Sequence, residues 1–266
     1  MALINARGEM PFLDHLEELR WRIFKAGGAV MVSLGLGWYL VRRFRVTQVL
    51  VEPIEEFLDG GQLAVFKPTT PFFLELKLAL IVGLILVFPI LMYQVWAFLS
   101  PALEKREKRM IVPALYMGMV LFAIGAGLAY LIALPVSLDF LFGFQTDFLH
   151  LMIGADEYLA FVVRLLLAFG IIFELPVVVL ILSVLGLVTP AFLRKKRRHA
   201  VVLITVTASV LSPGDVLMVT VLMMVPLFLL YEFSIFLSVL VTRSRSREEP
   251  TILPPTEPPE GAVEAE

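Results

Sequence analysis

The sequence predicts an all-α polytopic membrane protein with six transmembrane helices. Hydrophobic residues make up 59% of the chain, the mean hydropathy is +0.89, and only 17% of residues are charged, a balance far from that of a soluble domain. Several apolar runs are long enough to cross a hydrocarbon core of ~30 Å at ~1.5 Å per residue. Lys and Arg gather in short segments between these runs, which indicates a fixed orientation in the membrane.

Six spans are expected within a membrane domain at 23–241, which follows a cytoplasmic segment at 1–22. A tail at 242–266 is rich in Pro, Glu and Arg and poor in bulky apolar residues, so we expect it to be disordered. The first apolar run is longer than the apolar part of a secretory signal and no cleavage site follows it, which favours a retained span. The predicted spans are 23–41, 74–99, 110–134, 158–188, 199–211 and 216–241.

Charge places both termini in the cytoplasm. The cationic run at 194–198 and the arginines of the tail both prefer the cytoplasmic side, so the chain between them crosses an even number of times. Two short final spans joined by a turn at 212–215 meet this condition, although 199–211 reaches only about 18 Å as a helix. The segment 135–157 contains acids and no Lys or Arg, and we expect it outside.

The fourth run contains the most informative residue, Glu174, which lies at middle depth. A charge at the bilayer centre costs at least ~2.5 kcal/mol, so Glu174 should face the bundle interior or a wet cavity. Pro176 removes a backbone donor beside it and predicts a kink, as do Pro89 and Pro226 in other spans.

The third span is expected to pack closely against its neighbours. It carries three glycines, small residues that let the backbones of two helices approach each other. They are Gly118, Gly125 and Gly127.

Several kinds of chemistry find no support in the sequence. The chain has no cysteine, and its three histidines lie in different segments, so we expect no disulfide, metal site or cofactor. No G-x-S-x-G stands in a span and no phosphate-binding loop is present, so an enzyme is not expected, nor is a nucleic-acid partner. An ion-coupled secondary transporter using Glu174 stays open as an alternative, although the two related halves typical of that class are not found.

Four motifs resemble one family. HLEELRWR stands at 15–22, YQVWAFLSPALEKREKR at 93–109, FELP at 173–176 and LRKKR at 193–197. In this order and spacing they resemble TatC, the six-span core subunit of the twin-arginine protein translocase, over about residues 10–240. The most specific of them is YQVWAFLSPAL.

The resemblance implies a receptor in the cytoplasmic (inner) membrane that binds the twin-arginine signal peptides of folded precursors. It also implies single-span TatA and TatB partners, export driven by the proton-motive force, and a homo-oligomeric receptor complex. The signal-binding carboxylates would be Glu18 and Glu107, with Arg20 and Phe98 nearby, and the family's membrane-embedded glutamate matches Glu174. The cationic run at 194–198 could also attract anionic membrane lipids.

Charge chemistry supports these carboxylates independently. A guanidinium is always charged and pairs bidentately with a carboxylate, so two acids could distinguish paired arginines from paired lysines. A local alternative remains, in which Glu18 pairs with Arg22, and Glu104 with Lys108, at helical i, i+4 spacing.

The chain departs from the family pattern in three places. The turn 212–215 reads SPGD where the family usually has TPPD, Val219 replaces a residue that is often polar, and Glu107 is followed by Lys and Arg where two arginines are common.

Overall fold

The structure is a computed structural model that describes residues 12–58, 62–103, 105–143, 152–211 and 217–246. This part of the chain is helical apart from short connections and one isolated bridge between Ala64 and Gly154. The predicted turn at 212–215 and most of the predicted tail lie outside the described residues. The helices are α1 Phe12–Arg43, α2 Val46–Val51, η1 Glu52–Phe57, α3 Thr70–Leu99, η2 Ser100–Ala102, α4 Lys105–Leu128, η3 Ala129–Ala133, α5 Leu134–Phe142, α6 Ala155–Phe173, α7 Leu175–Val184, α8 Pro190–Lys195, α9 Arg197–Leu211 and α10 Leu217–Ser246.

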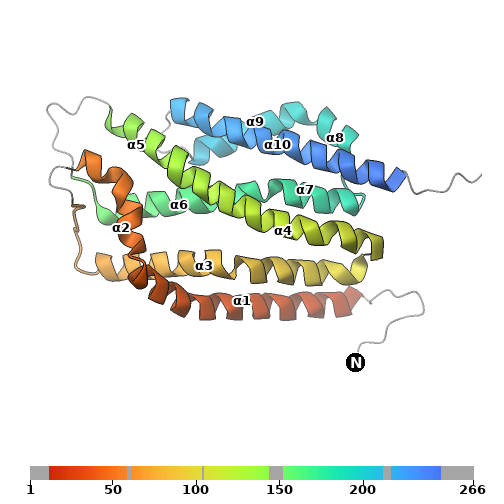
Figure 1. Ribbon diagram of the computed structural model, residues 1–266, viewed down its shortest axis with the longest axis horizontal. Coiled ribbons are helices and arrows are strands. Elements are labelled where there is room, and N and C mark those ends of the chain that lie inside the picture. Colours follow the sequence, from red (N-terminus) through yellow and green to blue (C-terminus); the bar gives the residue numbers. More distant parts are fainter. Residues whose placement is uncertain (1–11, 59–61, 104, 144–151, 212–216, 247–266) are drawn as a thin grey trace, which may run out of the picture.

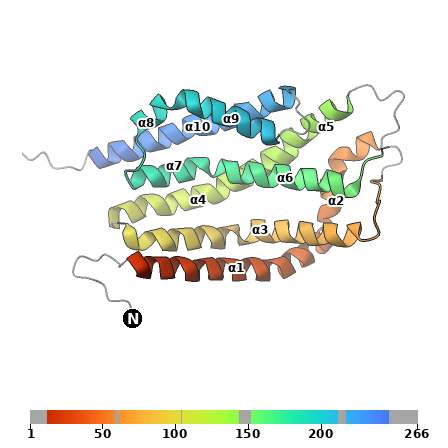
Figure 2. The same ribbon diagram turned by 180° about the vertical axis from the view of Figure 1, so that it is seen from behind.

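The long helices lie side by side as one elongated bundle (Figures 1 and 2). One end of the bundle, which we call the N end, holds the start of α1, the end of α3, the start of α4 and the end of α10. The opposite end, the loop end, holds α2, η1 and the starts of α3 and α6. The described chain therefore begins and finishes at the same end.

Five helical stretches are long and apolar enough to cross a membrane, so the chain is a multi-pass helical membrane protein. These stretches are Leu13–Arg43, Thr70–Leu99, Lys108–Phe142, Ala155–Val184 and Met223–Thr242. The remaining predicted span corresponds to α9, whose 15 residues reach only about 22 Å. It packs against α10.

The third long helix runs further than the sequence indicated. Residues 110–134 were expected to form the span and the segment 135–157 to lie outside, and the helix continues to Phe142. A π-helical turn, η3, precedes Pro135, which then lies in the first turn of α5. A proline is tolerated in the first turn of a helix because the backbone N–H groups of that turn do not need to donate a hydrogen bond within the helix.

The expected bend beside Glu174 is confirmed, because α6 ends at Phe173 and α7 begins at Leu175. Pro176 stands in the first turn of α7, where it ends the hydrogen-bond ladder of α6. Pro89 and Pro226 instead lie inside α3 and α10, which continue past them.

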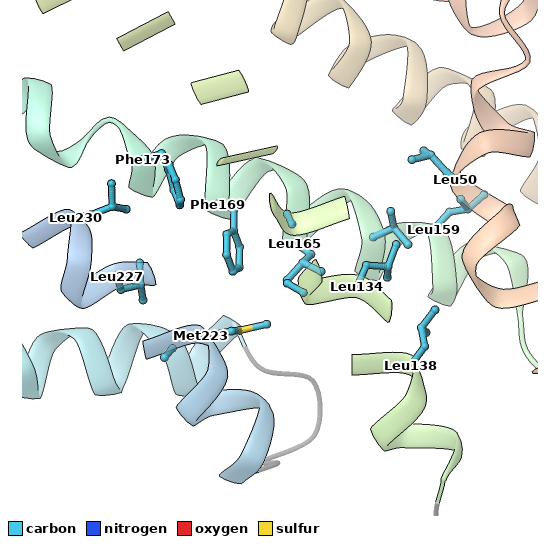
Figure 3. Packing of buried hydrophobic residues seen from close by; sticks show 14 of the residues in the cluster. Leu50, Leu134, Leu138, Leu159, Leu165, Phe169, Phe173, Met223, Leu227 and Leu230 are labelled. Atoms are coloured by element: carbon cyan, nitrogen blue, oxygen red, sulfur yellow. The ribbon is translucent and has the colours of Figure 1, made fainter. Parts of the chain in front are cut away.

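The core lies along α6, whose buried side chains face α5, α10 and the loop end (Figure 3).

Two of the three glycines predicted to let the third span pack closely against a neighbouring helix do so. A Cβ added at Gly125 would lie 2.7 Å from the ring of Phe173, and one at Gly118 would lie 2.7 Å from the carboxylate of Glu174. Gly127 differs, since a Cβ there would meet nothing within 4 Å. Figure 3 labels core residues Leu50, Leu134, Leu138, Leu159, Leu165, Phe169, Phe173, Met223, Leu227 and Leu230.

Candidate functional site

The first candidate site lies at the N end and is centred on Glu18 of α1. Arg22, one helical turn further on, donates from Nε to Glu18 Oε1 at 3.0 Å and from Nη2 to the same oxygen. The Glu18 side chain is 20% exposed. The local i, i+4 alternative is therefore confirmed for Glu18, whereas Glu104 lies outside the described residues.

The other oxygen of Glu18 has no such bond. Within the described part of the chain, Oε2 is buried without a hydrogen-bond partner, and the Nδ1 atom of His15 lies 3.7 Å away. The His15 ring stacks on Phe98 of α3, with centroids 4.4 Å apart and planes 13° apart. This stack joins α1 to α3 and places an aromatic wall beside the carboxylate. His15 was not predicted as part of the site, although its i, i+3 spacing from Glu18 was visible in the sequence.

Arg20 and Glu107 are less tightly defined. Arg20 is exposed, and its guanidinium lies 5.7 Å from the centroid of the Phe24 ring on the same helix. Glu107 lies in the first turn of α4, at the same end of the bundle, but its side chain is outside the described part (Figure 1). The pairing of Glu18 with Glu107 stays a prediction.

The second candidate site is Glu174, at the break between α6 and α7. Its backbone N–H donates to the carbonyl of Ile171 at 3.1 Å, which closes the last turn of α6. Its side chain packs against α4, where a Cβ at Gly118 would lie 2.7 Å from Oε2 and 3.4 Å from Cδ. Oε1 is buried and finds no hydrogen-bond partner in the described segments. The absence of a side chain at position 118 thus makes room for the carboxylate, a role that no sequence pattern indicated.

Metal chemistry is not suggested by the described side chains, among which no group of three or more His, Cys, Asp or Glu residues could hold an ion. The positions at which the sequence departs from the family pattern near the outer turn cannot be placed in either candidate site. The turn 212–215 is outside the described residues, and Val219 lies in α10 with its side chain undescribed.

These features define a multi-pass helical membrane protein with a carboxylate, Glu174, at a break in one of its long apolar stretches, and comparisons with known proteins give its family. The family model of the Sec-independent protein translocase protein (TatC) matches residues 14–226. The chain belongs to the TatC family and is a core component of a twin-arginine protein translocase. The transporter alternative is therefore set aside.

The individual matches cover most of the chain. The TatC protein of Aquifex aeolicus (strain VF5) is 38% identical over 89% of this chain and 98% of its own length. The TatC protein of Escherichia coli (strain K12) is 36% identical over 92% of this chain and 95% of its own length. A crystal structure of the twin-arginine translocase receptor TatC superposes with a TM-score of 0.74 at 39% identity, covering 86% of this chain and 100% of that one.

Proposed function

We propose that the N end of the bundle is the cytoplasmic docking surface for twin-arginine signal peptides, with Glu18 and Glu107 as the acids that receive the two guanidinium groups. One observation carries this proposal. The Glu18 carboxylate already holds a guanidinium through Oε1, while Oε2 has no hydrogen bond in the described structure.

Arg22 acts here as a stand-in for an incoming arginine. Its contact with Glu18 supports the proposal, because it involves the same planar, five-donor cation that a signal arginine would present. A signal arginine could use Oε2 beside Arg22 once the ring of His15 moves, and its guanidinium plane could then stack on Phe98. A lysine offers a point charge without this planar fork, so paired lysines should bind less well.

The test is capture of a twin-arginine precursor by the purified protein and its variants. Losing one charge-assisted hydrogen-bonding partner costs about 1.5–3 kcal/mol, so Glu18→Ala and Glu107→Ala should each weaken capture by about 10- to 100-fold. Glu17→Ala is the matched control, because Glu17 is an exposed acid on the same turn of α1 with no described contact to the site. Equal capture by wild type and both site variants would contradict the proposal, and so would equal capture of a twin-lysine precursor.

We further propose six spans within the membrane domain 23–241, with the segments 1–22 and 242–266 in the cytoplasm. The arrangement supports this, because α9 leads away from the N end and α10 returns to it (Figures 1 and 2). Two contacts fix α10 to the segment that begins α9. Arg197 at the start of α9 donates to Glu232 of α10 at 2.7 Å, and the Tyr231 hydroxyl of α10 donates to the carbonyl of Leu193 in the preceding α8 at 2.7 Å.

The absence of cysteine allows a direct test of this topology. Single cysteines placed at Glu17 and at Arg198 should react from the cytoplasmic side, and one at Glu56 in η1 should react from the opposite side. Labelling of the first two from different sides would contradict an even number of crossings between them.

The remaining assignments concern partners and location. We propose the cytoplasmic membrane as the site of action, single-span TatA- and TatB-type subunits and a second copy of this chain as partners, and contacts with membrane lipids. Glu174 is proposed to act in the transport step after the precursor has bound. The chain then works by binding and rearrangement, without a catalytic step of its own.

A further inference from the structure

A small pocket with polar and apolar walls opens at the loop end, far from both candidate sites. Its volume is about 380 Å³, and its walls come from the connection before α3, the first two turns of α3 and the start of α6. The lining residues are Lys67, Thr69, Thr70, Phe73, Leu74, Lys77 and Asp156.

The walls of this pocket are fixed by backbone hydrogen bonds between distant segments. The N–H of Ala64 donates to the carbonyl of Ile153, and the N–H of Ala155 donates to the carbonyl of Ala64, each at 2.9 Å. Gly154 lies at the closest approach, since a Cβ there would be 3.1 Å from the Phe66 ring and 3.2 Å from Asp156 Oδ1. The connection before α3 and the start of α6 therefore hold a defined relative position.

The charges around the pocket favour an anion. Lys67 and Lys77 are exposed, and neither has an ion pair or hydrogen bond with any residue that the structure describes. Asp156 is the opposing charge on the wall, which leaves one net positive charge among the lining side chains. The start of the 30-residue helix α3 adds its positive dipole end at the same point, although Thr70 N–H already donates to the carbonyl of Lys67 and Phe73 N–H to that of Thr69.

A hydroxyl group on the pocket wall can bind the same kind of ligand. Thr70 is only 6% exposed as a residue and lines the pocket, and its hydroxyl has no hydrogen-bond partner within the described segments. This hydroxyl oxygen is not among the fully buried side-chain atoms without a partner, so it remains available to donate to an oxygen atom of a ligand. Oxygen atoms of a phosphate group can accept from this hydroxyl and from both ammonium groups together.

The surroundings indicate that the phosphate belongs to a lipid. Phe73, which is 52% exposed, lines the pocket, and the exposed Phe66 and Phe72 belong to the same chain segments, as in the aromatic belts at membrane interfaces. Lys77 lies about 10 Å along α3 from Thr70, inside the apolar span. A lysine at that depth extends its ammonium group toward headgroups. Phe73 and Leu74 supply an apolar wall for an acyl chain.

We propose that this pocket binds the phosphate of an anionic phospholipid in the leaflet at the loop end of the bundle. Lys67, Lys77 and the Thr70 hydroxyl contact the phosphate oxygens. Asp156 weakens the binding by repulsion, so the site favours a lipid that stays exchangeable.

The test measures binding of phosphatidylglycerol to the full-length purified chain by native mass spectrometry, with phosphatidylcholine and inorganic phosphate as parallel probes. A lysine near a membrane surface contributes about 1 kcal/mol, so Lys67→Gln and Lys77→Gln should each weaken phosphatidylglycerol binding about 5-fold. Thr70→Val should also weaken it, whereas Asp156→Asn should strengthen it. Arg43→Gln is the matched control, because Arg43 is an exposed cation at the same end that does not line the pocket.

Three results would overturn the proposal. Arg43→Gln could weaken binding as much as the lysine variants, which would mean charge attraction without a site. Phosphatidylcholine could bind as tightly as phosphatidylglycerol, which would mean that the site does not select an anionic lipid. Inorganic phosphate could displace phosphatidylglycerol at equal concentration, which would mean that the site binds free phosphate rather than a lipid. A melting temperature unchanged from wild type in lipid-free detergent establishes that each variant is folded before its binding is compared.

Discussion

Gly118→Ala is the most informative substitution for the embedded acid. The new methyl carbon would lie 2.7 Å from Glu174 Oε2, a distance that real side chains do not adopt, so the carboxylate must move away from α4. The carboxylate is the far end of a flexible side chain, so this shift costs little, and the higher helix propensity of alanine stabilises α4 by about 1 kcal/mol. We therefore expect little change in stability together with a displaced Glu174 carboxylate.

The assay compares precursor capture with completed transport. Displacing Glu174 should leave capture at the N end unchanged and slow transport. Gly127→Ala is the matched control on the same helix, since a Cβ there meets nothing within 4 Å, and it should preserve transport and stability. Glu174→Asp shortens the side chain by one methylene group and should partly restore transport in the Gly118→Ala background. Equal effects of the two glycine substitutions, or no response to the shorter acid, would refute the role of Gly118.

Three other predictions concern the bundle. Glu174→Gln keeps the size of the side chain but removes its charge, so precursor capture should persist while transport slows; loss of capture would contradict this division of roles. Ser183 and Ser238 share a buried hydrogen bond of 2.8 Å between α7 and α10, so Ser183→Ala and Ser238→Ala should couple by about 0.6 kcal/mol in a double-mutant cycle of unfolding free energies, and strict additivity would count against it. Arg197→Gln breaks a half-exposed pair with Glu232 and should cost at most about 1 kcal/mol in thermal unfolding, whereas a larger loss would mean that the pair is shielded from solvent.

Much of the architecture follows from local sequence patterns. Long apolar runs identify the spans, because a helix of this length satisfies its backbone hydrogen bonds internally within the lipid. The break at Glu174 was predictable because Pro176 cannot donate a backbone hydrogen bond. The continuation past Pro135 was not, because it depends on a π turn that places this proline at a tolerated position.

In the candidate sites, too, contacts within one helix could be predicted from the sequence, whereas contacts between helices could not. The i, i+4 contact between Glu18 and Arg22 is local and was anticipated as an alternative. The stack of His15 on Phe98 and the room that Gly118 leaves for Glu174 both join helices far apart in the chain. Spacing along one helix contains no information on such contacts, so they became visible only with the packed bundle.

The central claim is that the N end receives the signal peptide, and photo-cross-linking at Phe98 tests it most directly. Its ring lies beside His15 and close to Glu18, so a photoreactive residue at this position should cross-link to the precursor near its paired arginines. A photoreactive residue at the exposed Phe72, at the loop end, should give no such product. Cross-linking from position 72 with none from position 98 would contradict the account.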